Sequence, residues 1–306
     1  MKLSHDEWLA ERRKSIGGSD AAAIVGMNHY VTPYMLWADK TSKIPEKPDN
    51  EAMRQGRDLE QYVADRFMEA TGKKVRRRAD FFRSKAFPFA HANIDRAVVG
   101  ERAGLECKTT SVMSLKKFKN GEFPENYYVQ CVHYLAVTGW DRWYLACVIL
   151  GQGFKWFAIE RDQAEIDALM QAESDFWSSY VVPDTPPPVD GLPPTSKTLE
   201  MIFPTSNPAE EPEDLRQYDD MIRNYIDTKA LIKSYQQELD RYKQQLQSEL
   251  GERETGICGD YSVSWKQQNR RMFDAARFAK DHPQLDLSGY YKESTFRKFD
   301  IKESTK

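Results

Sequence analysis

The 306-residue chain has no hydrophobic run that approaches the roughly 18 consecutive apolar residues of a membrane-spanning helix. Its first residues, MKLSHDEWLAERRKS, also lack the apolar stretch of a secretory signal. Hydrophobic residues make up 40% of the sequence and charged residues 30%, which excludes a disordered or collagen-like chain. These features predict a soluble intracellular protein with room for one large domain or two smaller ones.

Cysteine and histidine are scarce, with four and five residues, and no C-x-x-C or zinc-type Cys/His spacing occurs. A disulfide framework and a structural zinc site are therefore excluded, and we expect the cysteines to be buried apolar residues in a reducing compartment. The net charge of -3 does not indicate a nucleic-acid partner. Whole-chain charge decides little, however, because an enzyme that binds phosphates needs only one basic face.

Proline divides the chain, since nine of the fifteen prolines lie between Val181 and Asp214. Proline fixes φ and removes a backbone donor, so this stretch is predicted to be an extended connector. The sequence thus predicts an α/β domain over residues 1–180, a linker over 181–214 and an appendage over 215–306.

Within the first domain, apolar periodicity and capping residues predict helices over residues 6–14, 55–71, 125–138 and 162–180. Ser19 is expected to cap a short alanine-rich helix, and Thr32-Pro33 to begin another. Strands are predicted at residues 79–84, 89–99, 103–110, 143–150 and 154–160, of which the last two form a hairpin.

The appendage is predicted to begin with a long helix over residues 213–249. Its apolar and semi-apolar positions alternate in steps of three and four: Tyr218, Met221, Tyr225, Thr228, Ile232, Tyr235, Leu239, Tyr242 and Leu246. This heptad pattern fits a helix docked on a partner surface, a helical hairpin or a coiled-coil oligomer. Strands at residues 261–268 and 290–302 are expected to flank a short helix around residues 273–280.

The clearest chemical signal is Asp95 followed by Glu106-Cys107-Lys108. The period of two in a strand places Glu106 and Lys108 on one face and the Cys107 side chain on the opposite, apolar face of a half-buried strand. Gly100 and Gly104 allow a hairpin that returns Asp95 to this strand. Two carboxylates would then meet beside an ammonium group that holds or deprotonates an attacking water. Hard oxygen ligands suit Mg²⁺ or Mn²⁺, although an exposed strand with alternating charges gives the same pattern.

Two further polar residues lie among apolar helix positions. Glu60 falls within the apolar stripe of the 55–71 helix, where a carboxylate is costly unless it is paired, metal-bound or extended to water. Gln130 lies among apolar residues of the 125–138 helix, so it either orients water or is a satisfied core amide. His91 and His133 flank these segments, and we expect them to be core or rim residues and not a separate histidine-based site.

Five motifs in this order, ERRKSIGGSDAAAIVG, QGRDLEQYVADRF, HANIDR, GLECKTT and YYVQCVHYLAVTG, resemble the YqaJ-like viral recombinase family. This family comprises relatives of phage lambda exonuclease within the PD-(D/E)XK nuclease superfamily. The resemblance covers about residues 5–160 and implies an α/β (α+β), restriction-endonuclease-like core with a mixed central sheet flanked by helices. Asn93-Ile94-Asp95 departs from the more usual proline-aspartate but retains the carboxylate.

The resemblance also implies roles for the site residues. Asp95 and Glu106 would bind the metal, Lys108 would be the catalytic lysine, and Glu60 and Gln130 would be the helical residues beside them. The carbonyl of Cys107 is a further candidate metal ligand.

Arg12 and Ser19 match the arginine and serine with which the family holds a terminal phosphate. Helix N-termini favour anions, which supports this expectation. The basic residues expected to track the DNA backbone are Lys73, Lys74, Arg76, Lys116 and Lys117.

The function implied is a Mg²⁺- or Mn²⁺-dependent 5′→3′ exonuclease on double-stranded DNA. It would work beside a single-strand annealing protein in the cytoplasm of a bacterial host, with a phage or prophage origin, and as a homo-oligomer that in some relatives is a trimer. An endonuclease of the same superfamily and a non-catalytic DNA-binding scaffold are the alternatives.

Overall fold

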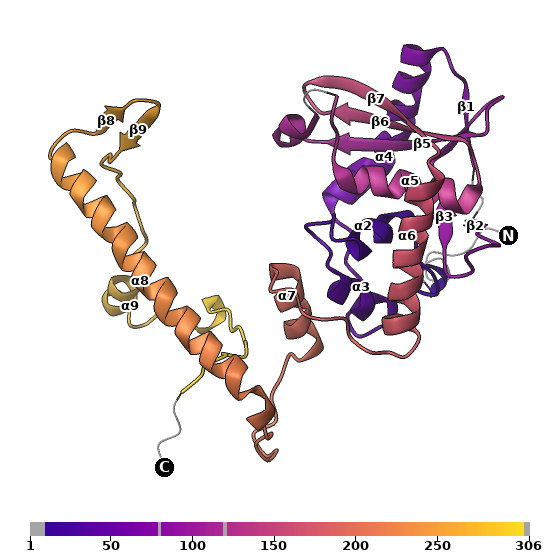
Figure 1. Ribbon diagram of the computed structural model, residues 1–306. Helices are drawn as coiled ribbons and strands as arrows, with labels where there is room; N and C mark the ends of the chain where they lie inside the picture. Colours follow the sequence, from indigo (N-terminus) through magenta and orange to yellow (C-terminus); the bar gives the residue numbers. More distant parts are fainter. Residues whose placement is uncertain (1–9, 79–80, 119–120, 303–306) are drawn as a thin grey trace. The chain divides into compact units, whose positions relative to one another are not determined.

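The computed structural model describes residues 10–78, 81–118 and 121–302. The chain divides into two units, Met1–Phe203 and Pro204–Lys306. The first unit contains a central sheet with helices around it, and the second contains a long helix with small elements (Figure 1). No helix in the described part is both long enough and apolar enough to cross a membrane.

The central sheet of the first unit has the strand order β1-β4-β5-β6-β7. Its strands are β1 (Val75–Arg77), β4 (Arg96–Val98), β5 (Ala103–Thr110), β6 (Arg142–Ile149) and β7 (Gly153–Glu160). β5 and β6 pair in parallel, whereas the other neighbours pair antiparallel. This mixed sheet flanked by helices confirms the predicted fold class, and β6 and β7 form the predicted hairpin.

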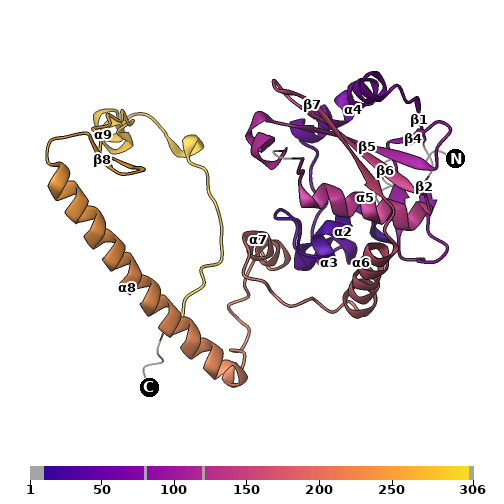
Figure 2. The ribbon, with the colours of Figure 1, turned by 45° about the horizontal axis from the view of Figure 1, so that its top comes forward.

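Helices cover both faces of this sheet. α4 (Glu51–Thr71) and α5 (Glu125–Thr138) lie on opposite sides of it (Figure 2). Leu105 of β5 packs with the apolar face of α4, whereas the neighbouring Glu106 bonds to a side chain of α5. β5 is therefore enclosed over residues 103–106 but only partly buried over residues 107–110, so the prediction of a half-buried strand is confirmed for its second half alone.

The other elements described here pack in three apolar clusters around the sheet. These elements are α2 (Gly18–Ile24), α3 (Pro33–Lys40), β2 (Phe81–Arg83), β3 (His91–Asn93), η1 (Val112–Phe118), α6 (Gln163–Phe176) and the π-helical turn η2 (Trp177–Val181). α2 packs directly against α5 and α6, while β2 and β3 form a small antiparallel pair. The short helix α2 is thus fixed between two longer ones.

Local signals predicted several helix ends correctly, although α4 begins at Glu51 and not at the predicted residue 55, because Asn50 caps it. Thr32 accepts the Met35 N–H at the start of α3, and Gly72 and Gly139 end α4 and α5 in left-handed conformations. The helix predicted over residues 6–14 lies partly outside the described residues. Ser19 does not cap α2, because Gly17 is the N-cap and the Asp20 carboxylate accepts its N–H.

The extended linker predicted over residues 181–214 is interrupted by α7 (Pro193–Ile202), which packs against α3. Thr195 and Thr198 of α7 are buried, and the Thr195 hydroxyl lies 2.8 Å from that of Thr32. Prolines at the first positions of a helix cost no hydrogen bond, so Pro193-Pro194 begin a helix here. The first unit consequently extends to Phe203.

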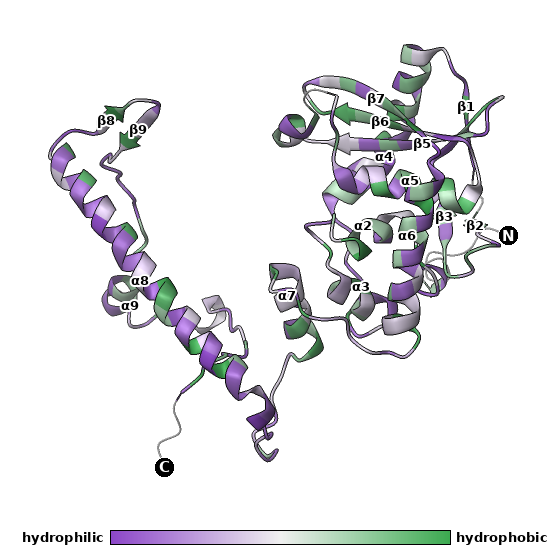
Figure 3. Cartoon of the chain, viewed as in Figure 1, coloured by the Kyte–Doolittle hydropathy of each residue, from purple (hydrophilic) through white to green (hydrophobic). Residues whose placement is uncertain are grey.

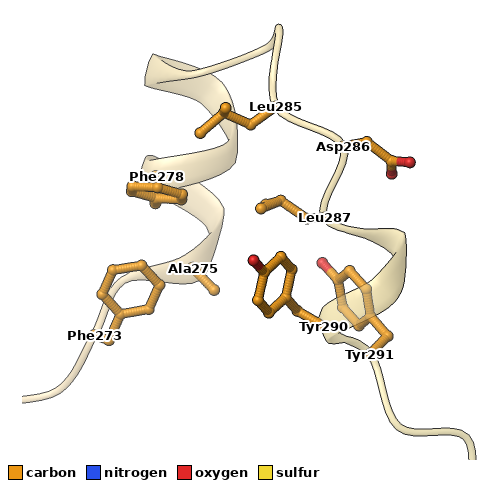
Figure 4. A pocket seen from close by; sticks show the side chains of 8 residues that line it. All are labelled: Phe273, Ala275, Phe278, Leu285, Asp286, Leu287, Tyr290 and Tyr291. Atoms are coloured by element: carbon orange, nitrogen blue, oxygen red, sulfur yellow. The ribbon is translucent and has the colours of Figure 1, made fainter.

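The second unit contains η3 (Arg216–Tyr218), α8 (Asp219–Leu250), the hairpin β8 (Thr255–Cys258) and β9 (Tyr261–Ser264), α9 (Ala275–Asp281) and η4 (Ser288–Tyr290). The strand predicted over 290–302 does not form, since this segment has no strand to pair with among the described residues. Cys131 and Cys147 are buried as predicted, but Cys258 is exposed. Aromatic and leucine side chains from α9 and the η4 segment line a cavity of about 530 Å³ (Figure 4).

Candidate active site

β5 delivers Glu106 and Lys108 to the same face of the sheet, as the strand period predicts. Lys108 Nζ lies 2.5 Å from Glu106 Oε1, and the Glu106 side chain is 4% exposed. Cys107 points the other way and packs beside the α4 cluster. The Lys108 ammonium and the Glu106 carboxylate therefore meet on the face of the sheet that α5 covers.

Gln130 of α5 binds both of these side chains. Its amide nitrogen donates to Glu106 Oε1 at 2.8 Å, and its amide oxygen accepts from Lys108 Nζ at 2.9 Å. The same nitrogen donates to the Tyr134 hydroxyl at 2.8 Å. Gln130 is thus a satisfied buried amide whose partners are the charged residues of β5.

Asp95 lies between β3 and β4 and reaches β5, as the predicted hairpin requires. Its Oδ2 atom accepts the Cys107 N–H at 2.8 Å. Burial and the nearby Glu106 carboxylate raise the pKa of Asp95 well above its usual value, although the Cys107 N–H opposes this shift. Asp95 and Glu106 are therefore buried close enough to repel each other, which a bound cation would relieve.

Lys108 is the positive charge beside these carboxylates. Burial lowers the pKa of Lys108, but the Glu106 carboxylate and then Asp95 raise it more, so the net pKa lies above its usual value. Its Nζ also lies 5.1 Å from the centroid of the Tyr127 ring. Lys108 is accordingly held as an ammonium between an acidic pair and an aromatic face.

Glu60 comes to this site with a partner that the sequence analysis missed. The buried guanidinium of Arg96 donates to the Glu60 carboxylate, to the Asp95 carbonyl at 2.7 Å and to Gln61 Oε1 at 3.1 Å. Glu60 was expected to be paired, metal-bound or extended to water, and in this structure it is paired with Arg96. Arg96 is the first residue of β4 and directly follows Asp95. A charged residue beside the apolar Ala97 and Val98 was the sequence feature that could have indicated a buried ion pair.

The side chains suit a hard divalent cation, although no three His, Cys, Asp or Glu residues in the described part converge as a complete ligand set. Glu106 Oε2 is buried with no hydrogen-bond partner, so it is available to a cation. Mg²⁺ keeps several waters and binds through one or two carboxylates plus phosphate, which Asp95 and Glu106 can supply. The donor set therefore fits Mg²⁺ or Mn²⁺.

Arg12 and Ser19, predicted to act together, are in contact. Arg12 Nη2 donates to Ser19 Oγ at 3.2 Å and lies 3.7 Å from the Asp20 carboxylate. Lys40 Nζ binds the same carboxylate at 2.6 Å. Burial alone would raise the pKa of Asp20, but Lys40 and Arg12 lower it to about 2.

Gly18 connects this second cluster to the first. A Cβ atom on Gly18 would lie 2.6 Å from Tyr134 Cε1 and 3.0 Å from Gln130 Cγ. The backbone of α2 approaches α5 this closely only because the residue is glycine. The turn that carries Ser19 is therefore packed directly on the helix that carries Gln130.

The basic residues predicted to track DNA lie at two places. Lys73, Lys74 and Arg76 lie at and before β1, and Lys116 and Lys117 lie exposed on η1. Lys73 forms an ion pair with Glu101, so part of its charge is already compensated.

The two histidines near the motifs are core residues, as expected. His133 is fully buried and pairs with Glu173 at 2.8 Å, while His91 binds the Ser15 hydroxyl at 2.8 Å. Burial, with a contribution from Lys40, lowers the pKa of His91 to about 3, so this ring is neutral.

Fold and site together define a sheet-and-helix protein in which Glu106, Lys108 and Gln130 are directly bonded, beside the carboxylate of Asp95. Residues 7–141 match the sequence model of the YqaJ-like viral recombinase domain. The uncharacterized protein YqaJ of Bacillus subtilis (strain 168) is 37% identical over 305 residues, which cover 99% of this chain and 95% of that protein. The chain belongs to the YqaJ-like viral recombinase family.

Two solved structures resemble part of the chain. An alkaline exonuclease (LHK-Exo) from Laribacter hongkongensis is 20% identical with a TM-score of 0.47, over 57% of this chain and 91% of that one. A phage related exonuclease from Haemophilus somnus 129PT is 12% identical with a TM-score of 0.44, over 56% and 96%. At these TM-scores the likenesses carry no conclusion about activity.

Proposed function

We propose that this chain is a metal-dependent deoxyribonuclease that degrades double-stranded DNA as a 5′→3′ exonuclease and exposes single strands for recombination. The observation that carries the proposal is the direct bonding of Glu106, Lys108 and Gln130 beside Asp95. Membership in the YqaJ-like viral recombinase family supports the same substrate class.

Asp95 and Glu106 would hold Mg²⁺ or Mn²⁺, with the carbonyl of Cys107 as an additional ligand. Glu60 would take part only by exchanging its contact with Arg96. When bound, such an ion makes water a better nucleophile and stabilises negative charge on phosphate oxygens.

Lys108 would donate hydrogen bonds to the reacting groups, and Gln130 would position Lys108. Lys108 has hydrogens to donate to an attacking water or to a phosphate oxygen, and Gln130 holds this ammonium against Glu106. Water would form a new bond to phosphorus and lose a proton while the P–O3′ bond breaks and O3′ takes up a proton, which releases a 5′-mononucleotide with a 3′-hydroxyl. Preorganised donors at such a site account for large rate effects because they need no reorganisation during the reaction.

Arg12, Ser19 and the first turn of α2 would hold the terminal 5′-phosphate and so set the direction of digestion. The exposed lysines of η1 and the basic residues around β1 would contact the DNA backbone. The single-stranded product would pass to a single-strand annealing protein in the cytoplasm of a bacterial host.

The direct test is linear duplex DNA labelled at either the 5′ or the 3′ end and incubated with Mg²⁺. We expect early release of a labelled mononucleotide from the 5′ end, progressive shortening of the 3′-labelled strand and no reaction in EDTA. Closed circular duplex should remain intact. Nicking of the circle would instead indicate an endonuclease, and DNA binding without cleavage under Mg²⁺ or Mn²⁺ would indicate a scaffold.

A further inference from the structure

The cavity of the second unit has aromatic walls that the nuclease site does not use. Phe273 and Phe278 lie on one side of it, and Tyr290 and Tyr291 lie on the other (Figure 4). Its volume of about 530 Å³ is within the range of known ligand sites. Tyr290 and Tyr291 are 88% and 73% exposed, so most of each ring is accessible to a ligand.

Cations lie directly beside these rings. Arg277 precedes Phe278 in α9, and Lys292 follows Tyr291. Because consecutive Cα atoms are about 3.8 Å apart, each cation is attached to a wall of the cavity. Arg277 has an exposed ion pair with Asp281 at 3.5 Å, a kind of pair that contributes little, and among the described residues Lys292 forms no ion pair. The cavity therefore has positive charge at both walls.

The same pairing of ring and cation recurs through residues 265–302. This segment has seven aromatic residues, and five of them directly adjoin a lysine or arginine in the sequence: Trp265, Phe278, Tyr291, Phe296 and Phe299. It carries nine lysines and arginines against five aspartates and glutamates, although the whole chain has a net charge of -3. Basic and aromatic residues are thus concentrated in one segment of an acidic chain.

The acidic residues around the cavity are engaged in local capping. The Asp286 carboxylate accepts the Ser288 N–H at 2.9 Å, and the Asp274 carboxylate accepts the Arg277 N–H at 2.8 Å at the start of α9. The Asp286 carboxylate also points away from the four rings (Figure 4). Asp286 therefore does not make the cavity a site for a cationic ligand.

We propose that residues 265–302 bind single-stranded DNA, with a base in the aromatic cavity and the adjacent phosphates at Arg277 and Lys292. Sites for single strands combine rings on which bases stack with cations that pair with phosphates. A duplex keeps its bases inside the stack, so it offers phosphates but no free base. An acidic peptide would satisfy the cations but would leave the ring faces without a flat partner. The assignment to DNA and not RNA rests on the proposed function, because digestion of one strand leaves the other single-stranded.

The test is the fluorescence anisotropy of a labelled oligo(dT) strand and of a labelled duplex of the same length, with the full chain in EDTA. Tyr290→Ala/Tyr291→Ala should bind the single strand about 5–150-fold more weakly than wild type, which corresponds to about 1–3 kcal/mol for one stacked base. Its affinity for the duplex should not change. Undiminished binding of the single strand, or an equal loss on both substrates, would overturn the proposal.

Tyr235→Ala is the matched control for the loss of a ring. Tyr235 is 68% exposed and lies on α8, where hydrophobic positions recur between hydrophilic ones (Figure 3). This variant should bind the single strand like wild type, and circular dichroism should show the wild-type fold for both variants because all three rings are exposed. An equal loss of binding in Tyr235→Ala would exclude the cavity as the site.

Lys292→Ala tests the contact with phosphate. The logarithm of the association constant falls linearly with the logarithm of the salt concentration, by about 0.7 for each phosphate of a single strand that is neutralised. Lys292→Ala should therefore lower this slope by about 0.7, whereas Lys233→Ala, at an exposed lysine of α8, should leave it unchanged. The same slope in wild type and Lys292→Ala would overturn the phosphate contact.

The location is tested with an oligonucleotide that contains 5-iodo-2′-deoxyuridine, which forms a cross-link to a stacked aromatic ring under ultraviolet light. Mass spectrometry should place the cross-link within residues 265–302, and cross-links confined to the first unit would overturn the proposal. Tighter binding of oligo(U) RNA than of oligo(dT) would overturn the assignment to DNA. In Mg²⁺, Tyr290→Ala/Tyr291→Ala should release mononucleotides from a short duplex at the wild-type rate. Failure of strand binding and failure of the nuclease proposal are therefore observed separately.

Discussion

Lys40 Nζ lies 2.6 Å from Asp20 Oδ2, and the Lys40 side chain is completely buried. The same ammonium donates to the carbonyls of Arg12 and Ser15 at 2.9 and 2.8 Å. Asp20 therefore lies between two cations, with Arg12 at 3.7 Å on its other side. The buried Asp20 carboxylate is therefore paired with both cations, and the Arg12 guanidinium contacts Ser19 as well as Asp20.

We expect Lys40→Met to lower the free energy of unfolding by about 3–5 kcal/mol, because it leaves the Asp20 carboxylate buried without its closest partner. The double variant Lys40→Met/Asp20→Asn should be more stable than the sum of the single losses predicts, with a coupling of about 1–3 kcal/mol. Urea unfolding followed by circular dichroism measures all three variants. Lys85→Met, at an exposed lysine, is the matched control and should change stability little. Additive losses would contradict the coupling.

Asp20 also predicts a pH dependence of stability. Its folded pKa of about 2 lies below the ordinary 3.8 because Lys40 and Arg12 together outweigh burial. A depressed carboxylate pKa stabilises the fold above pH 3.8, and this contribution is lost as the pH falls from 3.8 through 2. The stability difference between wild type and Asp20→Asn should thus shrink by about 2 kcal/mol between pH 6 and pH 2 in urea titrations. A difference that does not vary with pH would exclude this role.

Arg12→Ala should reduce digestion of 5′-phosphorylated ends more than that of 5′-hydroxyl ends. A charge-assisted hydrogen bond contributes about 1.5–3 kcal/mol, so we expect a loss of about 10–100-fold in kcat/KM for phosphorylated ends. Initial rates on two duplexes that differ only in this phosphate measure the ratio. An equal loss on both substrates would remove Arg12 from phosphate binding.

The central cluster was predictable because it depends on local rules. The strand period alone places Glu106 and Lys108 together, and the turn at Gly100, which has a φ of 82°, returns Asp95 to them. Arg96 was not predictable as the partner of Glu60, because the two are 36 positions apart and meet only when α4 packs beside β4. Long-range pairing of this kind leaves no periodic trace in the sequence.

The fold shows the same division between local and distant causes. The ends of α3 and α5 follow from Thr32 and Gly139, which act within one turn. α7 was missed because proline suggested an extended linker, whereas its burial depends on α3, far away in the sequence. The segment 290–302 has strand-like composition, but among residues 10–78, 81–118 and 121–302 no strand pairs with it to complete its hydrogen bonds.

Lys108→Ala should lower the cleavage rate by about 10²–10³-fold, because it removes a preorganised donor from the site. Its stability should fall, because Glu106 is left without its ammonium partner. The apolar packing of β5 on the opposite face remains, so the fold and most of the DNA affinity should persist at temperatures below unfolding. Single-turnover digestion of labelled duplex, beside a gel-shift titration, separates these two quantities. Lys85→Ala should digest DNA at the wild-type rate. Turnover by Lys108→Ala close to that of Lys85→Ala would refute the assignment.

Two glycines offer a matched comparison of packing. Gly18→Ala should destabilise the first unit by about 1–3 kcal/mol, because its Cβ would overlap the Tyr134 ring and push α2 away from α5. Gly56→Ala, in the interior of α4, meets no atom within 4 Å and should stabilise the protein by about 1 kcal/mol through helix propensity. Thermal unfolding of both variants measures whether each change in stability is a loss or a gain.

Since Gly18 also sets the distance from Ser19 to Gln130, Gly18→Ala should lower kcat on 5′-phosphorylated duplex at temperatures where it remains fully folded. Gly56→Ala should leave kcat unchanged, and a folded Gly18→Ala with wild-type kcat would show that the contact serves stability alone.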